Sequence, residues 1–420
     1  MDPEDVPDWA ASFAAFCTRF DDLFSRSESR EQARKYLRGL LAGLERKTTW
    51  QLAEVVKDGT PDRMQRLLYR VPWDAEAARD RLQQFVIERF GDPEGIAVLD
   101  ETGIPKKGTR SVGVHKQYCG ALGKIENCQV ATLVTYATAR GHVFLDRRLF
   151  LPEEWCWDRA RRTRAQVPQE VTFQTKPEQA RAMLEHAWEQ EVPMRWVTGD
   201  SVYGDSPDLR AAIQAHGCWY VLALTSVIRC WLEPPALEEP QQETGGRPRR
   251  AVRLAKSAPK AQTVAEVIAA LPKALWKRLS IATGTKGPRV YDWARVRVIE
   301  SRNGFPGPEV WLLVRRSVSD PKELTYYFAL APKTVSLQQL ATVAGTRYTV
   351  EQVIKEAKSE VGFDRYGVRY WQSWYRHITL SMLAQVWLAD RRLVAGEKNG
   401  LGRSQRARSA TPAGSSPAFA

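Results

Sequence analysis

The stretch Gly95–Gly103, GIAVLDETG, decides how the rest of this chain can be interpreted. Its apolar residues, Ile96 to Leu99, form an unbroken run, which is typical of a strand buried on both faces. The run stops at Asp100, so we expect a carboxylate at the end of a buried strand. A fixed backbone there can hold the side chain against a metal ion. Metal-assisted chemistry needs further carboxylates, and the sequence offers Asp200 and Glu351.

Length and composition limit the class of protein. The chain has 420 residues, 43% of them hydrophobic, which is enough for one large core and a second domain or insertion. No apolar run reaches the roughly 18 residues of a membrane helix, and the acidic start MDPEDVPDW does not fit a signal peptide. We therefore expect a cytoplasmic protein with no membrane partner. The net charge of +13 favours a polyanionic partner, nucleic acid before membrane.

Residues 6–90 are predicted to be helical. Helices are expected to begin after Ser29, Thr48, Thr60-Pro61 and Asp74, and the last ends at Gly91. The second and third, joined by Lys57-Asp58-Gly59, have the size of a helix-turn-helix. Arg63, Arg66 and Arg70 would line part of the later helix, as DNA contacts require. An ordinary helical bundle with a solvated face is the alternative.

From Gly95 the pattern changes to that of an α/β domain. A basic, glycine-rich loop follows the first strand, and its Lys106 and Lys107 are predicted to bind DNA. Two strands at 128–138 and 142–151, joined at Arg140-Gly141, precede a helix at 177–191, a strand that ends at Asp200, a helix at 206–217 and a strand at 218–224. Three meandering strands followed by alternating helices and strands are the order of a ribonuclease H-like α/β fold. Its first and fourth strands are neighbours, so Asp100 and Asp200 would converge.

The regular pattern is interrupted after this core. Residues 233–260 are expected to be an exposed linker, and strand-like runs at 289–299, 309–316 and 324–330 alternate apolar with polar residues. They predict an inserted antiparallel β subdomain, after which the helical pattern resumes near Thr346. The predicted parts are an all-α, DNA-binding domain at 1–92, the first part of the core at 93–228, the linker and insertion at 229–340, helices that complete the core at 341–395, and a disordered basic tail at 396–420.

The segment Thr346–Lys358, TRYTVEQVIKEAK, is predicted to carry the third carboxylate. Arg347, Glu351 and Lys358 fall within roughly 40° of one another on a helical wheel, beside a stripe of valines. The helix can bury its valines against the sheet and present one acid between two cations. On spacing alone, a solvated helix face is the alternative.

Other acids of the sequence compete with these three. Glu101 would point to the face opposite Asp100 if the strand continues, and Asp205 could be a helix cap with Ser206. Glu356 lies about 140° from Glu351 on the wheel, and Asp146 is expected to pair with Arg147 or Arg148.

The motifs LDETG, TGDSVYGD and R-x3-E-x6-K, in this order, resemble those of the DDE transposases of bacterial insertion sequences. The similarity is greatest to the subgroup with a β-rich insertion and the signature Y-x2-R-x3-E-x6-K. Arg347, Glu351 and Lys358 match that signature, whereas Ala344 stands where it has tyrosine and Tyr348 is out of register. The resemblance extends from about Gly95 to Ala395.

This resemblance implies an enzyme with two Mg²⁺ or Mn²⁺ ions. Both ions prefer hard carboxylate oxygens as ligands, and the six cysteines and five histidines are scattered along the chain, which agrees with such a site. Asp100 would bridge the ions, Asp200 and Glu351 would each hold one, and Arg347 and Lys358 would grip the phosphate. The implied reaction is cleavage at element ends and joining of their 3′ ends to target DNA. The implied partner is double-stranded DNA, bound by a homodimer near the bacterial nucleoid.

Two other hypotheses remain open at this point. One is a metal-dependent nuclease with the same core, and the other is a domesticated DNA-binding protein that keeps the fold without the activity. An aromatic residue of the insertion is implied to stack on a displaced base, and the sequence does not choose among Trp276, Trp293 and Trp311.

Overall fold

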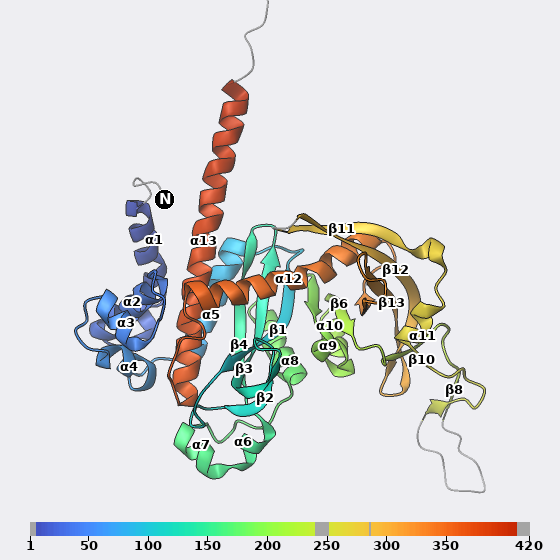
Figure 1. Cartoon of the computed structure of the whole chain (residues 1–420), viewed down its shortest axis with the longest axis horizontal. Coiled ribbons are helices and arrows are strands. Elements are labelled where there is room, and N and C mark those ends of the chain that lie inside the picture. Colours follow the sequence, from blue (N-terminus) through green and yellow to red (C-terminus); the bar gives the residue numbers. More distant parts are fainter. Residues whose placement is uncertain (1–5, 240–251, 285–286, 410–420) are drawn as a thin grey trace, which may run out of the picture.

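The computed structural model describes residues 6–239, 252–284 and 287–409. The fold is mixed α/β, as predicted, and is built on one large sheet (Figure 1). Its core strands lie in the order β4-β3-β1-β5-β6, with β1, β5 and β6 parallel. This is the arrangement of a ribonuclease H-like core, in which the first and fourth core strands are neighbours. The bounds are Ile96–Pro105 for β1, Lys124–Thr138 for β3, Gly141–Phe150 for β4, Trp196–Gly199 for β5 and Trp219–Leu224 for β6.

The apolar run suggested that strand β1 ends at Asp100, but the strand continues beyond this residue. Its parallel pairing with β5 covers only Ile96 to Leu99, but its antiparallel pairing with β3 continues to Pro105. The apolar run therefore marked only the part of β1 that has neighbours on both sides. Asp100 is the first residue beyond that part, where the edge of β1 that faced β5 becomes open.

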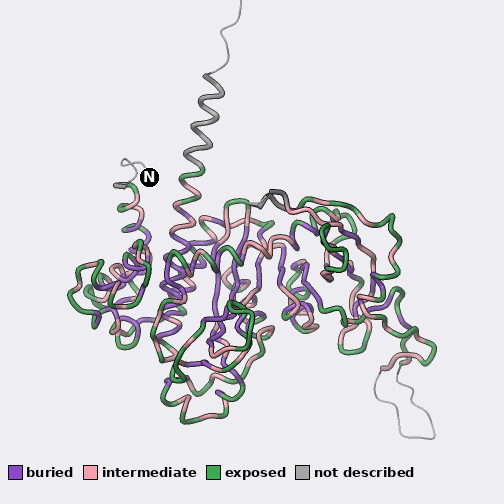
Figure 2. Tube along the Cα trace, viewed as in Figure 1, coloured by how far each residue is buried: buried purple, intermediate pink, exposed green. Residues whose placement is uncertain are grey.

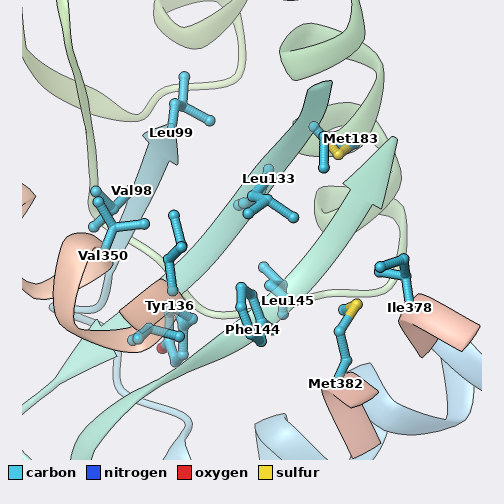
Figure 3. Close-up of a cluster of buried hydrophobic side chains, with 14 of the residues drawn as sticks. Val98, Leu99, Leu133, Tyr136, Phe144, Leu145, Met183, Val350, Ile378 and Met382 are labelled. Atoms are coloured by element: carbon cyan, nitrogen blue, oxygen red, sulfur yellow. The ribbon is translucent and has the colours of Figure 1, made fainter. Parts of the chain in front are cut away.

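Helices cover both faces of the core sheet. Lys176, the first residue of α8 (Lys176–Glu189), forms an ion pair with Glu101, whereas Lys358 of α12 (Leu337–Glu360) donates a hydrogen bond to Thr102. Successive side chains of a strand point to opposite faces, so α8 and α12 lie on opposite sides of β1. On the α12 side, Val350 packs beside Val98 (Figure 3), and the central residues of the core strands are buried (Figure 2).

Five α-helices precede the sheet: α1 (Val6–Thr18), α2 (Ser27–Leu41), α3 (Thr49–Val55), α4 (Asp62–Tyr69) and α5 (Ala75–Phe90). Asp74 caps α5 as predicted, accepting a hydrogen bond from the N–H of Glu76. The α3–α4 turn has left-handed residues at Lys57 and Gly59. Its Asp58 accepts hydrogen bonds from Gln32 and Lys35 of α2, which fix the turn to that helix.

The inserted strands extend the core sheet, because β14 (Leu324–Leu330) pairs antiparallel with β6. They continue through β13 (Phe305–Ser317) to β12 (Gly287–Arg302). The free edge of β12 pairs with β11 (Lys277–Gly284) near one end of the strand and with β7 (Arg229–Trp231), itself paired with β10 (Gln262–Thr263), near the other. The insertion is antiparallel, as predicted. The buried pair Arg210–Glu300 joins α10 (Pro207–Ala215) of the core to β12.

Shorter elements that sequence patterns did not predict complete the connections. They are β2 (His115–Cys119), α6 (Glu153–Trp157), α7 (Arg159–Ala165), α9 (Ser201–Gly204), the pair β8 (Leu237–Glu238) and β9 (Arg253–Leu254), and two 3-10 turns at Asp21–Leu23 and Lys273–Leu275. Helix α11 (Val264–Ala269) follows β9 and β10. Most are too short to develop a periodic pattern.

The C-terminal helices begin and end beyond their predicted limits. Helix α12 starts at Leu337, not near Thr346, because Ser336 caps it and its first half packs on the inserted strands. Helix α13 (Trp371–Ser409) continues past Gly396, where an irregular tail was expected. In this segment the helix-favouring Glu, Lys, Leu, Arg, Gln and Ala residues outnumber the three glycines. Residues 410–420 of that predicted tail lie outside the described residues. No described helix is long and apolar enough to cross a membrane.

Candidate active site

Asp100 and Asp200 lie on neighbouring strands of the core. Leu99 pairs with Gly199 in the parallel register of β1 and β5, so the two aspartates follow that pair directly. Asp200 is also the N-cap of α9, where its Oδ1 accepts a hydrogen bond from the N–H of Val202 at 2.9 Å. A Cβ at Gly204 would lie 1.8 Å from the carbonyl oxygen of Ala223, so the turn that follows Asp200 requires glycine.

The electrostatics of this pair are unusual for aspartates. Burial raises the pKa of Asp100 to about 7, and the neighbouring Asp200 carboxylate adds to the rise. A hydrogen bond from the N–H of Glu101 and the charge of Arg347 oppose it. Two carboxylates that are held together in this way repel each other when both are ionised, and a divalent cation removes that repulsion.

Glu351 faces the same pocket as Asp100. The pocket, about 470 Å³ in volume, is lined by Asp100, Glu101, Thr102, Glu351, Lys358 and Arg365 among others. Glu351 is exposed, and its Oε1 lies 3.6 Å from Nη2 of Arg347. Among the residues that the structure describes, no three His, Cys, Asp or Glu side chains are grouped closely enough to hold a metal ion. The two aspartates therefore lie next to each other, and Glu351 lies across the pocket from Asp100.

The two predicted phosphate-binding cations lie beside the acids. Lys358 Nζ donates hydrogen bonds to Thr102 Oγ1 at 2.7 Å and to the carbonyl of Gly103 at 3.3 Å, and burial lowers the pKa of Lys358. Arg347 lies close enough to Asp100 to lower the pKa of that carboxyl. Both cations can therefore act at the site without moving to another part of the fold.

The other predicted DNA-binding residues have different environments. Lys106 is turned inward, with Nζ 3.5 Å from the centre of the Tyr366 ring and bonded to the Tyr366 carbonyl, and burial lowers its pKa to about 8. The glycine-rich composition of the loop suggested that this side chain is exposed. It packs instead on Tyr366, which comes from a distant segment. Lys107 is exposed. Arg63 and Arg66 are exposed on α4 and line a separate hollow.

Each rival acid has a partner of its own. Glu101 pairs with Lys176, and Asp205 accepts hydrogen bonds from Thr225 while Ser206 caps α10. Glu356 pairs with Arg392, and buried Asp146 contacts Arg147, as predicted, but is held more closely by Arg79 at 2.8 Å.

The three tryptophans of the insertion are not free platforms. Trp293 is fully buried and stacks on Tyr327, and guanidinium groups cover the rings of Trp276 and Trp311 at 4.1 and 4.0 Å. Sequence reasoning also missed Lys355, Ser359 and Arg365, which line the carboxylate pocket. The helical wheel could have suggested Lys355 and Ser359, which follow Glu351 by about one and two turns. No pattern pointed to Arg365, because it lies between helices.

The fold and this site define a class of protein, the ribonuclease H-like proteins with paired acids after adjacent strands. A family model described as "DDE superfamily endonuclease" matches residues 19–288, and the chain belongs to this family. The family membership that the motifs predicted is therefore confirmed. The match includes Asp100 and Asp200 and ends before Glu351.

One named relative extends the comparison. The chain is 31% identical over 193 residues to a protein of Microchaete diplosiphon named "Probable transposase for insertion sequence element IS701". The aligned part is 46% of this chain and 47% of the relative, so the chain spans about half the length of the protein that it matches.

The raised pKa of Asp100 predicts a pH-dependent stability without metal. Since the folded pKa, about 7, exceeds the ordinary value of 3.8, the protonated carboxyl stabilises the fold at low pH and this contribution is lost as the pH rises through 7. In EDTA, Asp100→Asn should therefore melt a few degrees above the parent at pH 8, and this advantage should shrink at pH 5. Thermal unfolding between pH 5 and 8 measures this. An advantage that stays constant with pH would contradict it.

Proposed function

We propose that this protein is a DNA transposase, which cleaves the ends of an insertion sequence and joins their 3′ ends to target DNA by metal-assisted phosphoryl transfer. The observation that carries the proposal is the convergence of Asp100 and Asp200 at the open edge of β1, with the pKa of Asp100 raised to about 7. Family membership and the named relative support it.

The donor set fits hard divalent cations. Asp100, Asp200 and Glu351 offer carboxylate oxygens, which Mg²⁺ and Mn²⁺ prefer. In this proposal Asp100, Asp200 and Glu351 would together hold the ions. When bound, such ions activate the attacking water or hydroxyl and stabilise the leaving oxygen. The fit rests on the chemistry of the acids and on the repulsion between the two aspartates, which bound cations would relieve.

The remaining groups act by position and charge. Lys358, bonded to Thr102 and Gly103, presents an ammonium group at the wall of the carboxylate pocket, and Arg347 presents a guanidinium beside Glu351. In our proposal both bind oxygens of the scissile phosphate and stabilise the charge that develops there. Arg63 and Arg66 bind the DNA backbone outside the site, and Lys107 is available to do so.

Two alternatives use the same core. A nuclease would cleave without joining, and a domesticated DNA-binding protein would do neither. The three acids favour an active enzyme over the second alternative. We further propose that the active form is a homodimer on double-stranded DNA in the bacterial cytoplasm, near the nucleoid.

The decisive experiment uses donor DNA with inverted terminal repeats taken from a genomic copy of the element, together with a supercoiled target plasmid. With Mg²⁺ or Mn²⁺, a transposase joins donor 3′ ends to the plasmid, which gel analysis and sequencing of the junctions detect. Cleaved donor without junctions would favour the nuclease. Shifted but uncut donor would favour the DNA-binding protein.

A further inference from the structure

Three hollows follow one another from the carboxylate pocket to α4. Arg365 lines both the carboxylate pocket and a second hollow of about 350 Å³, which we name the bridging hollow. Tyr69 of α4 lines the bridging hollow, and Arg63 and Arg66, also of α4, line a third hollow of about 630 Å³. Helix α4 therefore separates the second and third hollows, and Arg365 connects the second to the acids.

The floor of the bridging hollow is the segment 365–370 between α12 and α13, and it is firmly held. The carbonyl of Arg369 accepts a hydrogen bond from the N–H of Val112 at 3.0 Å. The hydroxyl of Tyr366 donates to Gln129 and accepts from Trp374. Arg365 and Arg369 are exposed, while Tyr366 between them is directed inward. Two arginines are thus presented to solvent from a fixed backbone.

The bridging hollow is lined by basic side chains and by no acidic one, although Asp364 and Glu360 lie near enough to interact with Arg365 and Lys47. The basic side chains are those of Lys47, Arg365 and Arg369. Arg369 forms no ion pair with a described residue, and the nearest carboxylate oxygen to Arg365 is that of Asp364 at 3.5 Å. On the α4 side, Arg70 lies 5.7 Å from the ring of Tyr69, which in turn contacts Tyr370. Guanidinium groups and aromatic rings in this arrangement suit a sugar-phosphate backbone.

We propose that one DNA duplex runs from α4 over the segment 365–370 into the carboxylate pocket, with Arg365 and Arg369 bound to its phosphates. This inference rests on the proposed function and adds the path of the substrate between the predicted DNA-binding helix and the acids. Since the segment is fixed to Val112 and Gln129, the protein sets the length of DNA between the contacts at α4 and the bond that is cut.

The test measures how salt weakens the binding of a fluorescent 30-bp duplex of arbitrary sequence, in EDTA so that no cleavage occurs. Each phosphate contact contributes about 0.9 to the slope of log K against log salt. Arg365→Gln/Arg369→Gln should reduce the slope by about 1.8 and weaken binding. Arg365→Lys/Arg369→Lys, which keeps the charge, should retain most of the slope.

A matched control removes two arginines away from the path. Arg181→Gln/Arg195→Gln changes the net charge equally. Arg181 pairs with Glu185 on α8, and Arg195, just before β5, pairs with Glu94, just before β1. This control variant should leave the slope of log K against log salt unchanged. An unchanged slope in Arg365→Gln/Arg369→Gln, or an equal loss in the control, would overturn the inference.

The outcome is separable from that of the proposed function, because binding in EDTA does not depend on cleavage. A lowered slope in a protein that never cuts DNA would keep the path and refute the transposase. Normal binding by Arg365→Gln/Arg369→Gln, in a protein that joins DNA, would refute the path alone.

Discussion

Asp100→Asn, Asp200→Asn and Glu351→Gln each lower the rate of donor cleavage and joining by at least about a thousand-fold, as expected for the loss of one ligand among three. The substitutions are nearly isosteric and remove a charge that the cations need. Asp100 and Asp200 follow a paired position of β1 and β5, and Glu351 faces the pocket of Asp100. Single-turnover cleavage of a labelled donor in Mg²⁺ measures the effect, and DNA binding in EDTA should remain.

Glu356→Gln is the matched control for this prediction. Glu356 lies on the same helix as Glu351, but it pairs with Arg392. Its substitution should change the cleavage rate less than about threefold, within the small effect of a surface ion pair. A Glu351→Gln protein as active as Glu356→Gln would remove Glu351 from the site and leave the two aspartates to be reassigned.

Arg210→Met destabilises the protein by about 3–5 kcal/mol, the second large effect that we expect, because it removes the fully buried one of the two arginines that pair with the buried Glu300 carboxylate. Arg210 and Glu300 are almost completely buried, and their closest atoms, Nε and Oε2, are 2.9 Å apart. Glu300 also contacts Arg302 and Tyr220, which soften the loss. Denaturant unfolding measures the change in the free energy of unfolding.

This ion pair connects the core to the insertion. Arg210 belongs to α10 of the core and Glu300 to β12 of the insertion, so the pair joins the two. Arg210→Met/Glu300→Met should recover much of the lost stability, because it removes both buried charges. A single substitution that costs less than about 1 kcal/mol would show that the pair contributes little to joining them.

Much of the core was predictable because its physical signals are local. The apolar run before Asp100, the strand that ends at Asp200 and the valine stripe beside Glu351 each reflect burial against one sheet. The order of strands then implied that β1 and β5 are neighbours. These signals were sufficient for the fold class and for the closeness of the two aspartates.

Signals that arise between distant segments were not predictable. Lys106 lies in a loop whose composition indicates exposure, yet it packs on Tyr366. Arg365 lies between helices and has no periodicity to mark it. The length of β1 beyond Asp100 depends on β3, and the early start of α12 depends on the inserted strands. In each case the deciding partner is far away in sequence.

The most direct test of the central claim is a crystal structure of the protein grown with Mn²⁺, in which anomalous scattering locates the ions. We expect anomalous peaks bound by Asp100, Asp200 and Glu351, and we expect these peaks to be absent in Asp100→Asn crystals. Peaks elsewhere, or Glu351 directed away from occupied aspartates, would contradict this claim.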